Sequence, residues 1–341
     1  MFIKSGIRSL FYSQRELFNS MRHVKNKTGK NSFAIMIDEL YCLFIYGTIF
    51  TEYEALRFYS LKRAERKTFI TTLYWLKELK KYNPEEYRDC FHEKKVFNQL
   101  FHKYVGRQFL DIDLSQNKEE LRLFFLNNKA ICLKKSDGAM GYQVGIFRNN
   151  EITFDELCSV INEKQYDLAE NVIESIPVIA DLNPTSLNTM RIVTIHFDGF
   201  FRVLVACQRI GALGNNVDNI SCGGSAAEIR IDTGELIPPF FANEYRKIST
   251  TIEGSGPTNG KTLQIPFWNE TIDMLKEACT IIPEIHIVGW DVAITPNGPV
   301  LVEGNETFDA PFMQLYYKNR IGIKNRYEQI IKESSEKKRF K

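Results

Sequence analysis

The sequence lacks the signatures of several common protein classes. Its seven cysteines are scattered and never form a CxxC pair, and its five histidines are equally dispersed, so neither a disulfide framework nor a zinc site is indicated. The formal net charge of +2 is too small for a dedicated nucleic-acid-binding protein. The N-terminus contains no continuous apolar run of the kind that secretory signals have. These absences predict a cytoplasmic protein with reduced thiols and no nucleic-acid partner.

The common nucleotide-binding and nucleophile motifs are also missing. Neither the P-loop pattern GxxxxGK[ST] nor the dinucleotide pattern GxGxxG occurs, and no Ser/His/Asp or Cys/His arrangement is apparent. The 341 residues, 44% of them hydrophobic and 25% charged, are typical of a globular protein with two or three subdomains. Charged residues near the ends of predicted strands are therefore the remaining candidates for a functional site.

The N-terminal third is predicted to be mostly helical. Residues 33–50 form the most apolar run, but Asp38 and Glu39 lie inside it, which favours a buried helix over a membrane span. Residues 1–30 carry seven Lys or Arg against the single acid Glu16. An amphipathic helix here could contact an anionic membrane surface or a phosphorylated glycan carrier, or it could pack on the body with its basic face in solvent.

A lysine followed by a glycine-punctuated segment has the features of a phosphate-covering loop. Short strands are predicted around it, at residues 123–126, 130–133 and 144–147. Lys134 would supply a point charge at a strand end, while Ser136, Gly138 and Gly141 would let backbone amides approach anionic oxygens. An ordinary hairpin turn beside a surface lysine pair explains the same pattern, and both interpretations remain open.

Two arginines lie at the ends of a strongly predicted hairpin. Its strands, residues 190–197 and 200–208, turn at Asp198-Gly199, with Arg191 at the start and Arg209 at the end. An arginine at the end of a half-buried strand generally needs an anion. That anion could be a bound phosphate or an acid of a later hairpin.

The later hairpin spans residues 288–305 and is acidic at its far end. A three-residue loop of Pro296, Asn297 and Gly298 would place Asp291 directly opposite Glu303, with Asn305 on the same face. Two opposed carboxylates repel unless a cation lies between them, which suits a hard divalent metal. A two-residue loop would put the acids on opposite faces, and an edge hairpin with solvated acids is the alternative.

In this order the segments resemble the ATP-grasp superfamily, and more narrowly the sugar-transfer-associated ATP-grasp proteins of bacterial polysaccharide gene clusters. The resemblance covers about residues 85–325 and is most specific at three motifs: NPTSLNTMRIVT (183–194), VDNISCGG (217–224) and GWDVAITPNGPVLVEGN (289–305). It implies an α+β ATP-grasp fold that grips ATP between antiparallel sheets. The implied parts are a helical N-terminal region (1–110), a small subdomain (111–180), a C-terminal subdomain (181–330) and a charged tail (331–341).

The resemblance also implies roles for individual residues on the nucleotide side. Lys94 would be the first lysine to contact ATP, although the neighbouring Lys95 leaves this uncertain by one position. Lys134 would hold the α- and β-phosphates beneath the loop 136–141. The adenine hinge and the ribose hydroxyls would be served by the backbone of Glu170, Val172 and Ile173 and by the side chain of Glu174.

On the other side of the site, the resemblance implies that Asp291, Glu303 and Asn305 hold one or two Mg²⁺ ions, with Mn²⁺ a possible substitute. Arg191 and Arg209 would stabilise charge on the transferred phosphoryl group or on an acyl phosphate.

The activity that the resemblance implies is an ADP-forming carboxylate–amine ligase of surface glycan biosynthesis. Its substrates would be a small-molecule or glycan carboxylate of the uronate type and an amino acid or amine. Two alternatives stay open: an ATP-dependent phosphotransferase acting on a glycan precursor, and a nucleotide-binding scaffold without catalysis.

Overall fold

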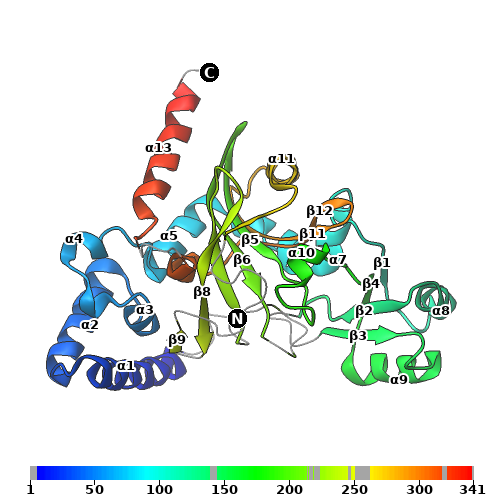
Figure 1. Ribbon diagram of the computed structural model, residues 1–341, viewed down its shortest axis with the longest axis horizontal. Helices are drawn as coiled ribbons and strands as arrows, with labels where there is room; N and C mark the ends of the chain where they lie inside the picture. Colours follow the sequence, from blue (N-terminus) through cyan, green and yellow to red (C-terminus); the bar gives the residue numbers. More distant parts are fainter. Residues whose placement is uncertain are drawn as a thin grey trace.

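Two antiparallel sheets and a group of N-terminal helices make up the α+β fold of the chain (Figure 1). The computed structural model describes residues 6–138, 144–212, 214, 218, 223–244, 247–249, 262–316 and 321–339. In Figure 1 the N-terminal helices lie on one side of the larger sheet and the smaller sheet lies on the other. The predicted fold class is confirmed.

The smaller sheet has four strands in the order β1-β4-β2-β3. Their bounds are Phe109–Asp111 (β1), Ala130–Lys134 (β2), Val144–Arg148 (β3) and Leu168–Asn171 (β4). Helices α8 (Lys118–Asn127) and α9 (Phe154–Lys164) belong to this part of the chain, and their buried faces share a core with the sheet. The strand predicted at 123–126 is wrong, because these residues continue helix α8, which buries Leu121 and Phe125 one turn apart.

The larger sheet has eight strands. Seven follow the order β10-β8-β7-β6-β5-β11-β12, and β9 pairs with β8 outside this path. Their bounds are Met190–Phe197 (β5), Phe200–Ile210 (β6), Ser225–Ile229 (β7), Glu235–Glu244 (β8), Lys247–Ser249 (β9), Leu263–Gln264 (β10), Ile287–Thr295 (β11) and Gly298–Asn305 (β12). The predicted turn at Asp198-Gly199 joins β5 to β6, and both residues have positive φ as a type I′ turn requires.

Two hydrophobic cores involve the larger sheet. One contains Trp290 and side chains of α6 (Asp89–His92), α7 (Lys94–Leu100) and α11 (Trp268–Ala278). The other contains Trp75 and side chains of α5 (Thr72–Tyr82), α12 (Ala310–Met313) and α13 (Lys324–Arg339). Short 3₁₀ helices at Glu85–Tyr87 (η2) and Gln314–Tyr316 (η5) complete this part. Strands β5, β6 and β11 contribute to both cores, which fixes the positions of the polar side chains at their ends.

The N-terminal region is helical, as predicted. It consists of α1 (Gly6–Thr28), α2 (Ser32–Tyr46), α3 (Phe50–Ala55), η1 (Phe58–Ser60) and α4 (Arg63–Arg66). The apolar run at 33–50 is divided at Gly47, which adopts the left-handed conformation that ends α2. Full burial of this run is wrong, because α2 leaves several large apolar side chains in solvent. None of the helices in the described ranges is long and apolar enough to cross a membrane.

A short linker connects the two sheets. After β4 the chain runs through residues 172–176 to α10 (Pro177–Ala180). The N–H of Ile176 donates to the carbonyl of Ile294 on β11, at 2.9 Å. The linker is thereby tied to the larger sheet within a few residues of leaving the smaller one.

Candidate active site

Strands β11 and β12 pair so that Asp291 lies directly opposite Glu303, as predicted. The turn and the strand register that produce this pairing differ from those predicted. Thr295 pairs with Gly298, so the turn has two residues, and the ladder continues regularly to Val292 opposite Leu301. A β-bulge then interrupts the register before Asp291.

The predicted three-residue loop is therefore wrong, although the pairing it was meant to explain is present. A two-residue turn alone would have separated the acids onto opposite faces. The bulge places one additional residue, Val302, on β12, which restores the pairing of Asp291 with Glu303. Asn305, two residues further along the strand, pairs with Gly289.

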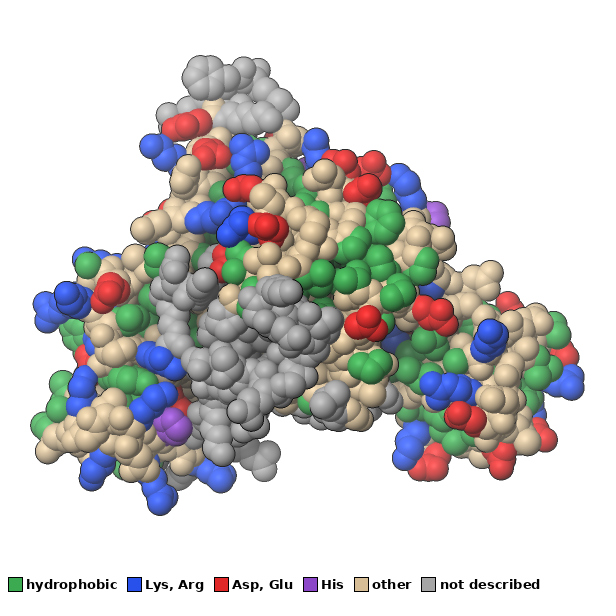
Figure 2. Space-filling view, in the orientation of Figure 1, with side chains coloured by type: hydrophobic (Ala, Val, Ile, Leu, Met, Phe, Trp, Pro, Cys, Tyr) green, Lys and Arg blue, Asp and Glu red, His purple; other side chains and the backbone are tan. Residues whose placement is uncertain are grey.

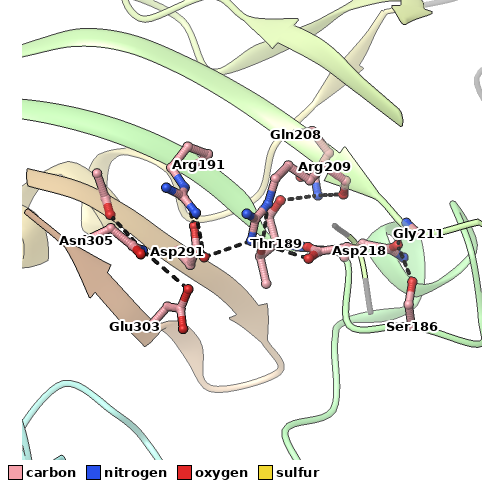
Figure 3. A network of polar contacts seen from close by, with 12 residues as sticks. Ser186, Thr189, Arg191, Gln208, Arg209, Gly211, Asp218, Asp291, Glu303 and Asn305 are labelled. Carbon is pink, nitrogen blue, oxygen red and sulfur yellow. Dashed lines mark hydrogen bonds and ion pairs between the residues drawn. The ribbon is translucent and has the colours of Figure 1, made fainter. Parts of the chain in front are cut away.

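Both arginines predicted to be functional converge on Asp291 (Figure 3). Arg191 donates from Nε to Oδ1 at 2.5 Å and from Nη2 to Oδ2 at 3.0 Å, while Nη2 of Arg209 lies 2.8 Å from Oδ2. Burial opposes ionisation of Asp291, but Arg191 and then Arg209 hold its pKa below the usual range. Asp291 is thus a buried, ionised carboxylate that fixes both guanidinium groups.

Arg209 has two further partners at the same nitrogen. Its Nη2 lies 3.3 Å from Asp218 and 2.6 Å from the hydroxyl of Thr189. Asp218 in turn accepts from the Thr189 N–H at 2.7 Å and from the Thr189 hydroxyl at 2.6 Å. These contacts link Asp218, Thr189, Arg209 and Asp291 in one chain of charge-assisted hydrogen bonds (Figure 3).

Glu303 is the second acid of the hairpin, and its environment differs from that of Asp291. Burial and the neighbouring Asp291 carboxylate raise its pKa. The amide Nδ2 of Asn305 lies 3.3 Å from its Oε1. Asp291 is buried and Glu303 is half-buried. Two carboxylates that face each other favour a cation between them, so this pair fits a divalent metal. Among the described residues no group of three or more His, Cys, Asp or Glu side chains is placed to hold a metal, so an amide or substrate oxygens must complete any such site.

Lys134 lies at the end of β2 on the smaller sheet, as predicted, and its ammonium is bound to Glu170. The Nζ of Lys134 is 2.5 Å from Glu170 Oε2. Although burial opposes both charges, this partner raises the pKa of Lys134, and Arg107 together with Lys134 lowers that of Glu170. The side chain of Glu170 therefore lies in a buried ion pair.

Arg107 was not predicted, yet it joins the two halves of the site. Its Nε lies 3.1 Å from Glu170 Oε2, and its Nη1 and Nη2 donate to the carbonyls of Leu301 at 2.8 Å and Val302 at 3.1 Å. Asn98 on α7 completes the cluster, donating to Glu170 at 2.7 Å. Arg107 thus connects strand β4 of the smaller sheet to the bulged residue of the acidic hairpin.

Lys94 binds the segment that follows β2. Its ammonium donates to the carbonyl of Gly138 and lies 3.4 Å from that of Ser136. Burial lowers the pKa of Lys94. Lys95 instead forms a 3.3 Å ion pair with Asp167. Lys94, not Lys95, is therefore the lysine of this segment that binds the carbonyls after β2.

The other residues predicted for the site lie after β2 and in the linker between the sheets. Ser136 is tied to Asp167, whose carboxylate accepts from its N–H and its hydroxyl at 2.6 Å each. Val172 and Ile173 are half-buried in the linker, and Glu174 beside them is exposed. Gly141 lies outside the described residues.

Residues that the sequence did not single out complete the network: Arg107, Asn98, Thr189 and Asp218. Thr189 and Asp218 lie inside two of the quoted motifs, so a signal for them existed. Arg107 and Asn98 belong to no motif, and the fold alone brings them to Glu170.

Comparisons with known proteins agree with this architecture. The sequence matches the model of the family described as sugar-transfer associated ATP-grasp over residues 77–332. A comparison with curated protein sequences gives no match.

Among solved structures, similar folds occur in ATP-grasp ligases. The ATP-grasp ligase PsnB in complex with precursor peptide PsnA2 and AMPPNP is 11% identical, with a TM-score of 0.45 over 74% of this chain and 62% of that one. The D-alanyl-alanine synthetase A of Vibrio cholerae is 9% identical, with a TM-score of 0.41 over 72% and 65%. The L-amino acid ligase of Bacillus licheniformis is 9% identical, with a TM-score of 0.38 over 65% and 42%. The chain thus spans less than two thirds of the length of each.

The family match covers well over half of the chain and includes the strands, the acidic hairpin and the two arginines described above. The chain therefore belongs to the sugar-transfer-associated ATP-grasp family.

Proposed function

We propose that this protein is an ATP- and Mg²⁺-dependent ligase that joins a carboxylate to an amine and releases ADP. One arrangement carries the proposal. Lys134 pairs with Glu170, which Arg107 joins to the strand that bears Glu303. Opposite Glu303, Asp291 holds two arginines. Phosphoryl transfer is chiefly a problem of positioning and charge neutralisation, and this set of side chains supplies both.

On the nucleotide side, Lys94 and Lys134 would bind the phosphates of ATP, beneath the loop that begins at Ser136. The linker residues Val172 and Ile173 would line the adenine with their backbone groups, and Glu174 would accept from the ribose hydroxyls. The ion pair of Lys134 with Glu170 supports this role, because it keeps the ammonium charged and oriented although it is buried.

The metal would be held by Glu303 and Asp291, with Asn305 beside them. Mg²⁺ prefers oxygen ligands and completes its shell with phosphate oxygens, whose charge it neutralises. The raised pKa of Glu303 supports this assignment, since a carboxylate opposite another gains stability from a cation. Asp291 already binds two arginines, so we assign Glu303 as the principal protein ligand.

Arg191 and Arg209 would act on the transferred phosphoryl group. In the reaction, a carboxylate oxygen of the substrate attacks the γ-phosphorus of ATP, the bond to the β-phosphate oxygen breaks, and ADP leaves. The amine nitrogen then attacks the carbonyl carbon of the acyl phosphate, loses a proton and displaces phosphate. Both guanidinium groups are oriented in advance by Asp291, which lowers the cost of stabilising the developing charge.

The family description points to sugar transfer, and the carboxylate would accordingly be a uronate-type group on a sugar or polysaccharide precursor. The amine would be an amino acid or a small amine. No structural observation favours direct phosphorylation of a glycan or a scaffold without catalysis, and one experiment separates all three.

The experiment incubates the full chain with ATP, Mg²⁺, a panel of uronate saccharides and a panel of amines. ADP release that requires both a carboxylate and an amine, with an amide product by mass spectrometry, is the expected result. A phosphorylated product that forms without an amine would replace the ligase by a phosphotransferase. Nucleotide binding without turnover on any pair would favour a scaffold.

Asp291→Asn and Glu303→Gln should abolish turnover. Glu151→Gln, an exposed substitution in the turn after β3, should have no effect and serves as the control.

A further inference from the structure

The N-terminal helices carry a surface that the active site does not use. Residues 1–82 contain 15 Lys and Arg against 7 Asp and Glu, a net charge of +8, whereas the whole chain has a net charge of +2. The remainder of the chain is therefore acidic, and the two parts differ strongly in charge. Figure 2 shows lysine and arginine side chains spread over the part of the molecule that contains α1 to α4.

The acids of this region are mostly withdrawn from its surface. Glu39 and Glu52 are almost fully buried, and Glu54 is buried beside His23. Asp38 forms a bidentate pair with Arg66, with both hydrogen bonds at 2.7 Å. The solvent-facing charge of the N-terminal region is accordingly more positive than its composition suggests.

Helix α2 presents large apolar side chains to solvent within this basic region. Phe33, Ile37 and Phe44 follow one another at spacings of four and seven residues, which places them on one helix face. Phe44 is 80% exposed, Phe33 67% and Ile45, beside Phe44, 59%. Helix α2 therefore has one face packed in the N-terminal core and another face of aromatic and aliphatic groups in solvent.

Helix α5 begins beside the C-terminal end of α2 and has an exposed apolar face of its own. The N–H of Leu73 donates to the carbonyl of Gly47 at 3.1 Å, so the start of α5 adjoins the C-terminal end of α2. Leu73 and Leu76 are each about half exposed, and Lys77 and Lys80 are exposed on the same helix face at spacings of four and seven from Leu73. Apolar and cationic side chains thus lie together on the exposed face of α5, next to the end of α2.

We propose that this apolar–basic face, made of Phe33, Ile37, Phe44, Ile45, Leu73 and Leu76 with Lys77 and Lys80 beside them, binds the surface of an anionic phospholipid bilayer. Apolar side chains would enter the acyl boundary while the lysines contact the phosphate groups. A nucleic acid would also attract the lysines, but it gives no reason for phenylalanine and isoleucine side chains on the same face. The proposal uses none of the active-site residues and stands apart from the ligase activity.

The proposal is tested by co-sedimentation of the full chain with vesicles. One set contains equal parts of phosphatidylglycerol and phosphatidylcholine, and the other contains phosphatidylcholine alone. We expect binding to the anionic vesicles that weakens with added salt, because the attraction of exposed charges is screened.

Two variants separate the apolar contribution from the charge contribution. Phe33→Ser with Phe44→Ser, and Lys77→Glu with Lys80→Glu, should each reduce the partition coefficient by about tenfold or more. All four side chains are exposed, so the variants should unfold at the temperature of the parent protein.

Helix α8, in the smaller-sheet lobe, offers matched controls. Leu123 and Leu126 are about half exposed, and Lys118 and Lys129 lie at its ends. Leu123→Ser with Leu126→Ser, and Lys118→Glu with Lys129→Glu, make the same chemical changes on another surface and should leave vesicle binding unchanged.

Four results would overturn the proposal. The first is the absence of binding to anionic vesicles, and the second is binding that the α8 variants reduce as much as the α2 and α5 variants do. The third is a dimer in light scattering that Phe33→Ser with Phe44→Ser dissociates, without vesicle binding by the parent. Binding to a DNA oligonucleotide in place of vesicles, unaffected by the serine variants, would likewise assign the lysines to another partner.

Discussion

Arg209 Nη2 lies 2.8 Å from Asp291 Oδ2, although their strands β6 and β11 are separated in the sheet by β5. The arginine therefore reaches across an entire strand to its partner. Asp218 and Thr189 contact the same nitrogen, Nη2, and help to hold it there. The position of this nitrogen thus depends on three partners together.

This relationship makes Asp218 a positioning residue whose loss can be measured. Asp218→Asn should lower the turnover number by about tenfold to a hundredfold, because Arg209 loses one of its two ionic partners and its fixed orientation. The KM for ATP should change little, since Asp218 is not proposed to touch the nucleotide. ADP release is the measurement, on whichever carboxylate and amine support turnover.

A control substitution tests whether the loss of any acidic side chain lowers turnover. Asp232→Asn, in the exposed turn between β7 and β8, should leave turnover unchanged. A rise in the KM for ATP at constant turnover number in Asp218→Asn would contradict the positioning role.

Among the buried cations, we expect Arg107 to be the one whose replacement lowers the free energy of unfolding most. Arg107→Met leaves Glu170 with one fewer cationic partner in a buried site and should lower the free energy of unfolding by about 3–5 kcal/mol. Urea unfolding followed by circular dichroism measures this change. Lys103→Met breaks an exposed pair with Glu277 and should cost less than about 1 kcal/mol. Equal losses in the two variants would count against a central role for Arg107.

Metal affinity should depend on pH through Glu303. Its pKa is raised, and a metal binds the deprotonated carboxylate, so affinity should fall as the pH drops through the raised pKa. Titration of Mn²⁺ followed by electron paramagnetic resonance measures the affinity at each pH. Glu303→Gln should bind weakly at every pH and lose this dependence. A dependence that persists in the variant would have to arise from another group.

Stability should also depend on pH, through a buried acid in the N-terminal core. Burial raises the pKa of Glu39 to about 7, against an unfolded value of 4.5, so the folded state binds its proton more tightly. Stability should therefore decrease as the pH rises from about 4.5 through 7, by up to about 3 kcal/mol from this group.

Glu39→Gln tests this dependence because it keeps an acceptor for the Ser20 hydroxyl without taking on charge. The variant should be more stable than the parent at pH 8, and the difference should shrink at pH 5. Thermal unfolding at the two pH values measures it, with Glu85→Gln on the exposed η2 helix as the control. A constant difference would show that Glu39 does not titrate on unfolding.

Much of the site could be predicted from the sequence because the patterns that indicate it are local. Arg191 and Arg209 could be placed at the ends of a hairpin that turns at Asp198-Gly199, and Asp291 and Glu303 fell within one later hairpin. Alternation along neighbouring strands is a short-range rule, so these residues could be related without knowledge of the whole fold.

Arg107 could not be predicted from the sequence because its role depends on distant parts of the chain. It contacts Glu170 and residues 301–302, and no spacing relates these positions in the sequence. The exposure of Phe44 was missed for a related reason: an apolar run predicts burial, whereas the packing of neighbouring helices decides which face is covered. The strand expected at 123–126 failed because four apolar residues do not distinguish a strand from the end of a helix.

The bulge at Val302 gives the acidic hairpin an unusual tolerance to changes in length. Deleting Val302 alone would make Glu303 follow Leu301 directly, so a regular ladder would still place Glu303 opposite Asp291. A three-residue turn made of the same residues would also align the acids, because it moves Gly298 from the strand into the turn and leaves no additional residue for a bulge. Related sequences with a three-residue turn should therefore be one residue shorter between the turn and the acid that corresponds to Glu303.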